Sequence, residues 1–141
     1  MNLQPYKRRM FSSIKTSRSN KDIVAHLTNK LNLGAENVIA RLAFSYSLSQ
    51  EAKLDLNMIQ DSAGKEYSVK VLFGSYTDIY IALICVHYNL HKTDKDISRY
   101  VKMHIDEGLQ QINRYIASKD SITGTEFLIN EVEKNMVYLN N

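Results

Sequence analysis

Residues 97–116 read ISRYVKMHIDEGLQQINRYI, and this stretch decides the fold. Its apolar residues recur every three or four positions, which is the spacing of one face of an α-helix. A long helix with one continuous apolar face is stable only when other elements cover that face. The stretch therefore predicts a helical core built around one amphipathic helix. The side chains expected to be buried are Ile97, Val101, Ile105, Leu109, Ile112 and Ile116.

Shorter helices are predicted on both sides of this stretch. Ser19 and Asp22 have the spacing of a capping box before the first of them, and Gly34 stands where that helix should end. The segment 76–89 is apolar all round, which favours a helix buried at the centre of a bundle or of an oligomer. The other helices are expected at 35–47, 68–73 and 125–138.

The N-terminal third has a different pattern from the rest of the chain. Residues 9–16 alternate loosely between polar and apolar side chains, which suggests a short strand. A strand followed by two helices is the order found in ribbon-helix-helix modules, in which the strands of two chains pair. With one Pro and five Gly in the chain, long helices are favoured over a turn-rich sandwich. The predicted fold class is mostly α, a compact helical domain with a ribbon-helix-helix-like N-terminal part.

The composition fits a single intracellular domain. Hydrophobic residues make up 44% of the chain, which is enough to bury one core. The lone cysteine, Cys85, cannot form an internal disulfide, and the apolar run 79–86 is too short to cross a bilayer. No apolar stretch follows the N-terminal cations, so no signal peptide is predicted and the cytoplasm is the expected location. Residues 1–9 are expected to form a flexible basic arm, 10–118 the helical domain and 119–141 a C-terminal helical extension.

Charge is concentrated at one end of the sequence. Residues 1–41 contain eight cations and two acids, a net charge of +6, whereas the remaining residues contain ten cations and thirteen acids, a net charge of −3. Such an asymmetry indicates a polyanionic partner, and phosphates are bound by Lys and Arg side chains together with free backbone N–H groups. A structural ion pair is the alternative role for Arg41. The predicted nucleic-acid-binding residues are Lys7, Arg8, Arg9, Lys15, Arg18, Lys21, Lys30 and Arg41.

The other ionisable side chains form no recognisable catalytic or metal-binding pattern. His87 and His91 have the i, i+4 spacing that can hold zinc, but no third ligand accompanies them. His104 is expected to hydrogen-bond a local partner. Asp106 and Glu107 are adjacent, so they diverge by about 100° around a helix, and they are expected on a solvated face. No catalytic residue, metal site or cofactor is therefore predicted.

Four segments follow one another at characteristic spacing over residues 10–116. They are LNLGAENVIARLAFSYSLS at 31–49, DSAGKEY at 61–67, LFGSY at 72–76 and HIDEGL at 104–109. Together, these segments resemble the DndE family of DNA sulfur modification proteins. The assignment of the three cations before residue 10 depends on charge alone, because they lie outside the matching region.

The resemblance implies a tetrameric helical protein that takes part in replacing a non-bridging phosphate oxygen of DNA with sulfur. It implies binding of duplex DNA, with a preference for nicked DNA, and work beside a cysteine desulfurase, a sulfur-transfer enzyme and an ATPase subunit. It implies no catalytic site in this subunit. The predicted function is thus a non-catalytic DNA-binding subunit of the phosphorothioation machinery. The alternatives are a ribbon-helix-helix transcriptional regulator and a pure scaffold for the modification enzymes.

Overall fold

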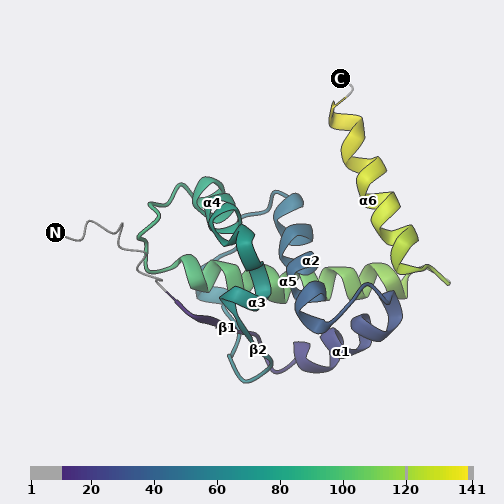
Figure 1. Cartoon of the computed structure of the whole chain (residues 1–141), viewed down its shortest axis with the longest axis horizontal. Helices are drawn as coiled ribbons and strands as arrows, with labels where there is room; N and C mark the ends of the chain where they lie inside the picture. Colours follow the sequence, from purple (N-terminus) through teal and green to yellow (C-terminus); the bar gives the residue numbers. More distant parts are fainter. Residues whose placement is uncertain (1–10, 120, 140–141) are drawn as a thin grey trace.

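The computed structural model describes residues 11–119 and 121–139, with side chains to residue 136. The basic arm predicted at 1–9 therefore lies outside the described residues. The fold is mostly α, as predicted, with a small two-stranded antiparallel sheet (Figure 1). In chain order the elements are β1 (Ser13–Lys15), α1 (Asn20–Leu31), α2 (Glu36–Ser49), η1 (Leu56–Met58), β2 (Glu66–Ser68), α3 (Val69–Phe73), η2 (Gly74–Tyr76), α4 (Thr77–Tyr88), α5 (Ile97–Ala117) and α6 (Gly124–Leu139).

Helix α5 is the central element of the fold, and the other helices gather around it (Figure 1). All the residues of its predicted apolar stripe are buried, which confirms the periodicity. Helix α2 packs most closely against it. A Cβ atom at Gly108 would lie 1.9 Å from the carbonyl oxygen of Ala43. The backbones of α2 and α5 therefore touch at this point, and only glycine fits there.

Strand β1 pairs with β2 of the same chain, with Ile14 opposite Tyr67 and Lys15 opposite Glu66. Ile14 and Tyr67 are both buried, so their packing fixes the register of the ladder. The predicted order of one strand and two helices is present as β1, α1 and α2. A ribbon-helix-helix dimer would pair β1 with a second chain, whereas here β2 provides the pairing within one chain.

Helix α1 begins where the sequence predicts, but the predicted capping box is wrong. Ser19 has helical dihedral angles (φ −61°, ψ −25°) and makes no side-chain cap. Its hydroxyl instead donates to Gln60 Oε1 at 3.2 Å, so the side chain is used to hold a distant loop. The helix also ends earlier than expected, at Leu31, because Asn32 takes the left-handed conformation that terminates it.

Helix α4 is mostly exposed in the single chain, although the sequence predicted burial within a bundle or within an oligomer. Its only fully buried side chain is Ile84, while Ile79, Leu83 and Val86 are 58%, 46% and 82% exposed. The reason is that α4 packs against α3 and α5 with one side only. The burial predicted within a bundle is therefore wrong, and burial within an oligomer stays a prediction.

The apolar stretch that contains α4 extends well beyond the run 79–86, which was predicted to be too short to cross a bilayer. By length and composition alone, Val69–Tyr88 could cross a membrane. The structure divides this stretch at Gly74, whose φ is +58°, into α3, η2 and α4. Leu72 and Phe73 lie in the hydrophobic core, but only 22% of the apolar window is buried, so most of this stretch is exposed in the single chain.

Helix α6 confirms the predicted C-terminal helix and projects from the end of α5 (Figure 1). Phe127 anchors it, with its ring centroid 5.8 Å from that of Tyr46 and 5.5 Å from that of Tyr115. Gly124 lies so close to α1 that a Cβ atom would meet the Leu31 carbonyl oxygen at 2.0 Å. Beyond this anchor, the apolar side chains of α6 are exposed in the single chain; they are Leu128, Ile129, Val132 and Met136.

Candidate nucleic-acid interface

Three predicted cations lie together in the segment that leads into α1, residues 15–21, which we name the basic segment. Lys15 ends β1, Arg18 precedes α1 and Lys21 is in its first turn, and all three side chains are exposed. Among the described residues, no carboxylate oxygen lies within 4.0 Å of their side-chain nitrogens. Their charges are therefore available to a partner.

Two acids near the basic segment accept hydrogen bonds from hydroxyl or backbone N–H groups. Glu66 lies opposite Lys15 in the sheet, but its carboxylate accepts a hydrogen bond from Ser13 Oγ at 2.7 Å. Asp61 accepts two hydrogen bonds through Oδ1, from the backbone N–H of Arg18 at 2.9 Å and from that of Ala63 at 3.0 Å. These bonds, the one from Arg18 first, hold the pKa of Asp61 below its usual value.

A tight turn after Asp61 brings the next residues against the basic segment. The N–H of Gly64 donates to the Thr16 carbonyl oxygen at 2.9 Å, and the N–H of Thr16 donates to the Lys65 carbonyl oxygen at 2.8 Å. A Cβ atom at Gly64 would lie 2.1 Å from the Ser17 carbonyl oxygen. The turn therefore requires glycine for this close backbone approach.

Asp106 holds the basic segment from the interior. Its Oδ1 accepts from the Ser17 N–H at 3.0 Å and from Asn20 Nδ2 at 2.7 Å, and its Oδ2 lies 2.6 Å from Lys102 Nζ. The prediction that Asp106 is solvated is wrong, since the residue is only 3% exposed. The charge is tolerated there because a cation and several donors replace water. Sequence reasoning missed Lys102, whose i, i+4 spacing to Asp106 was the available indication.

The other two described cations of the predicted set lie apart from the basic segment. Lys30 is exposed in the last turn of α1. Arg41 is half-buried on α2, and its Nη1 donates to the carbonyl oxygen of Leu72 at 3.1 Å. This bond satisfies a carbonyl at the end of α3, so Arg41 has a structural partner, although that partner is not an acid. Lys7, Arg8 and Arg9 lie outside the described residues.

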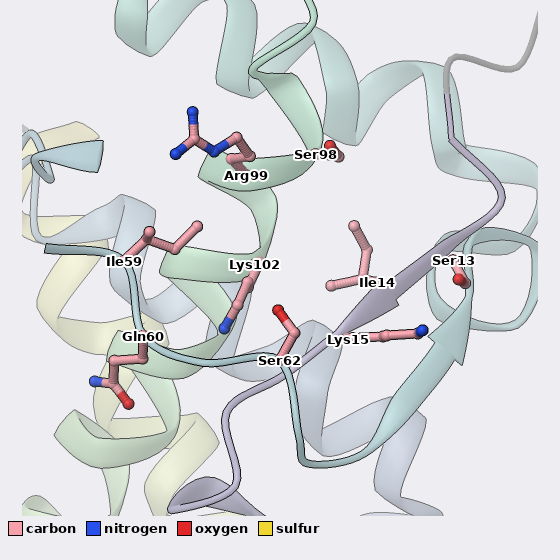
Figure 2. A pocket seen from close by; sticks show the side chains of 9 residues that line it. All are labelled: Ser13, Ile14, Lys15, Ile59, Gln60, Ser62, Ser98, Arg99 and Lys102. Carbon is pink, nitrogen blue, oxygen red and sulfur yellow. The ribbon is translucent and has the colours of Figure 1, made fainter. Parts of the chain in front are cut away.

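A cleft of about 390 Å³ opens beside the basic segment, between β1 and the start of α5. Figure 2 shows the charged ends of Lys15, Arg99 and Lys102 pointing in different directions and not at one centre. Arg99 is 3.2 Å from Asp96, and Lys102 is paired with Asp106. Among the described residues that line the cleft, Lys15 is the cation without a carboxylate partner, and the rest of the lining is hydroxyl, amide and apolar groups. The cleft therefore does not concentrate positive charge. Its lining residues are Ser13, Ile14, Lys15, Ile59, Gln60, Ser62, Ser98, Arg99 and Lys102.

His104 has the hydrogen-bond partners that the sequence predicted, but they lie on other elements of the fold and are not local in sequence. Its Nδ1 is 2.8 Å from Ser47 Oγ, and its Nε2 is 2.5 Å from the hydroxyl of Tyr88. The Tyr88 oxygen also accepts the N–H of Leu54, so Tyr88 links His104 to the loop before η1. Burial, with a smaller contribution from His87, lowers the pKa of His104 to about 4. Ser47 and His104 are within hydrogen-bond distance, as a nucleophile and its base would be, but both side chains are buried and inaccessible from the solvent.

The histidine pair considered for zinc is separated by the end of α4 at Tyr88. His87 Nε2 bonds to the carbonyl oxygen of Ala52 at 2.8 Å, and His91 Nδ1 bonds to the Thr93 hydroxyl at 2.7 Å. In the part of the chain that the structure describes, no three His, Cys, Asp or Glu side chains are grouped to hold a metal ion.

A comparison with known protein families identifies the family of this chain. The model of the family described as DNA sulphur modification protein DndE matches residues 13–120. The chain belongs to the DndE family. No curated relative matches it.

Two solved DndE structures share the fold. The crystal structure of DndE from Escherichia coli B7A, involved in DNA phosphorothioation modification, has a TM-score of 0.59. A DndE variant with glycine-to-lysine substitutions has a TM-score of 0.61. Each is 18% identical and covers 72% of this chain and 97% of its own. Helix α6 lies beyond the region matched by the family model.

Two of the DndE-like segments supply the contacts that hold this site. The segment 61–67 contributes Asp61 and Gly64, which fix the basic segment from outside. The segment 104–109 contributes Asp106, which fixes it from inside, and Gly108, which seats α2 on α5. The residues that carry the resemblance to DndE are thus packing and positioning residues in this chain.

Proposed function

We propose that this chain is a non-catalytic subunit of the cytoplasmic DNA phosphorothioation machinery that binds duplex DNA through its backbone phosphates. Membership of the DndE family supports the pathway. The observation that carries the DNA contact is the basic segment, in which Lys15, Arg18 and Lys21 are exposed and have no carboxylate partner among the residues that the structure describes. Contacts of this kind position a protein on DNA without reading its sequence.

Assembly of several copies would strengthen this contact. Three cations bind phosphates weakly, but linked copies act together and gain affinity without new contacts. The exposed stripe Ile79, Leu83 and Val86 on α4 supports association with further copies of the chain. A homotetramer is the expected state, working beside the cysteine desulfurase, the sulfur-transfer enzyme and the ATPase subunit. Nicked duplexes are the expected preferred DNA.

The test is a titration of random-sequence duplex DNA with the full-length protein over a series of salt concentrations. Each neutralised phosphate lowers the slope of log K against log salt by about 0.9. We expect a slope of roughly −3 for each subunit in contact with DNA, if all three cations of the basic segment are used. A flat salt response contradicts the proposal.

The same titration separates the rival functions. A ribbon-helix-helix regulator would bind its own operator more tightly than random duplex by about a thousandfold or more. The pairing of β1 with β2 in the same chain argues against a ribbon-helix-helix regulator, because such a protein pairs this strand with a second chain. A pure scaffold would sustain phosphorothioation in cells after Lys15, Arg18 and Lys21 are all replaced by Glu, whereas the DNA-binding subunit would lose it.

A further inference from the structure

Asp61 is an unexpected residue for a surface that binds phosphates. It is exposed, it is ionised, and it lies against the backbone of Arg18 at 2.9 Å. By charge alone, it should repel DNA. Building on the function proposed above, we propose that Asp61 is a positioning residue that holds the basic segment ready for the DNA backbone.

The contacts of Asp61 join two distant parts of the chain at one oxygen atom. Its Oδ1 accepts the N–H of Arg18 and the N–H of Ala63, so the loop and the basic segment share one acceptor. The hydroxyl of Ser19 adds a bond to Gln60 Oε1. The bonds from Arg18 to Asp61 and from Ser19 to Gln60 come from the residues just before α1, whose N–H groups have no partner within the helix.

Two carboxylates hold successive amides of the basic segment. Asp106 accepts the N–H of Ser17 from the interior, and Asp61 accepts the N–H of Arg18 from the exposed loop. With both amides bonded, the backbone of the basic segment is held at Ser17 and Arg18, and the Arg18 side chain is exposed. Ordering one residue of a flexible chain costs about 1–2 kcal/mol, and a segment that is already ordered avoids this loss when it binds.

Charge repulsion and positioning predict opposite effects when Asp61 is replaced. Asp61→Asn removes the charge but keeps a side-chain oxygen that can accept the two N–H bonds. Asp61→Ala removes the charge and the acceptor together. The two variants have the same net charge, so any difference in DNA affinity between them reports the hydrogen bonds.

The experiment measures duplex affinity and its salt slope for the full-length wild type, Asp61→Asn and Asp61→Ala. We expect Asp61→Asn to bind at least as tightly as wild type. We expect Asp61→Ala to bind roughly three- to tenfold more weakly than Asp61→Asn, because the basic segment is no longer ordered before binding. The salt slopes of the two variants should be equal, because the bound complexes neutralise the same phosphates. Hydrogen exchange at the Arg18 amide should be protected in wild type and Asp61→Asn and faster in Asp61→Ala.

Asp22 provides the matched control, because it is an exposed acid in the first turn of α1, next to Lys21. Asp22→Asn and Asp22→Ala should both bind DNA as tightly as wild type or more tightly, since only charge is removed. If circular dichroism shows that Asp61→Ala is unfolded, Asp61→Ser replaces it. Its shorter acceptor should give weaker binding than Asp61→Asn.

The outcomes separate a failure of the positioning role from a failure of the proposed function. Equal affinity of Asp61→Ala and Asp61→Asn, or tighter binding by Asp61→Ala, overturns the positioning role while the DNA-binding function stands. Wild type that shows no salt-dependent binding of duplex contradicts the proposed function, and the positioning role falls with it.

Discussion

Helices α5 and α4 are both rich in apolar residues, yet the structure uses them differently. In α5 the apolar residues lie on one face and are buried, and the polar residues Lys102 and Asp106 anchor the basic segment. In α4 the apolar residues surround the helix, and those on one side remain exposed. Periodicity therefore identifies the face that meets the core, whereas high apolar content alone leaves the partner of the helix undefined. Changes in α5 should affect folding, and changes in α4 should affect assembly.

The largest effect is expected from Asp106→Ala on α5. The substitution leaves Lys102 buried without its carboxylate and the Ser17 N–H without its acceptor. It also removes the shorter of the two bonds that Asn20 Nδ2 donates to residue 106. Breaking such a buried pair destabilises a protein by about 3–5 kcal/mol. Urea denaturation measures the loss, and the neighbouring Glu107→Ala should change stability much less. Comparable losses for the two variants would contradict the role given to Asp106.

Acid should destabilise the folded chain through His104 on α5. In the folded chain its pKa is about 4, below the value of about 6.5 for an unfolded chain. The unfolded state therefore binds the proton first, and stability present above pH 6.5 is lost as the pH falls towards 4. The loss is about 3 kcal/mol. Denaturation curves at pH 7 and pH 4.5 should show a smaller difference for His104→Gln than for wild type. His26→Gln, at an exposed site on α1, should keep the wild-type difference.

Gly108→Ala tests the contact between α5 and α2. The new Cβ would meet the Ala43 carbonyl oxygen at 1.9 Å, so the helices must separate. Overpacking of this kind costs roughly 1–3 kcal/mol. Thermal unfolding checks the effect, with Arg114→Ala at an exposed site on the same helix as the control. Stability equal to wild type would show that the two helices can shift freely.

The smallest effect on folding is expected from Val86→Asp on α4. Val86 is 82% exposed, so the stability of the single chain should change by less than about 0.5 kcal/mol. If α4 contacts further copies, the oligomer should dissociate, and sedimentation velocity measures this directly. Val132→Asp on α6, at a site 58% exposed, is the matched control. Dissociation by Val132→Asp and not by Val86→Asp would move the subunit contact to α6.

The sequence predicted local features of this fold well. Helix positions and the buried stripe of α5 follow from a spacing that repeats within a few residues. The contacts that build the site join residues far apart in the chain. Asp106 bonds Ser17 and Asn20, and Asp61 bonds Arg18, so no local pattern could indicate them. The segments that resemble DndE marked these positions without revealing what the residues contact.

The start of α1 likewise shows that a local sequence pattern does not identify a distant partner. The spacing of Ser19 and Asp22 fits a capping box, but Ser19 bonds Gln60 from a distant loop. A tertiary partner thus replaced the local one. The basic segment could be predicted because charge can be counted directly, whereas the exposure of its side chains depends on the loop and on α5.

The most direct test of the central claim compares two triple variants of the full-length chain. One replaces Lys15, Arg18 and Lys21 with Gln. The other replaces three exposed lysines outside the basic segment with Gln, namely Lys92, Lys95 and Lys134. Both lose three positive charges, so they differ only in where the charge is removed. We expect the first variant to lose most of the salt-dependent affinity for duplex DNA and the second to bind nearly as wild type does. Equal loss in both variants would contradict the account, because it would mean that net charge and not the basic segment holds the DNA.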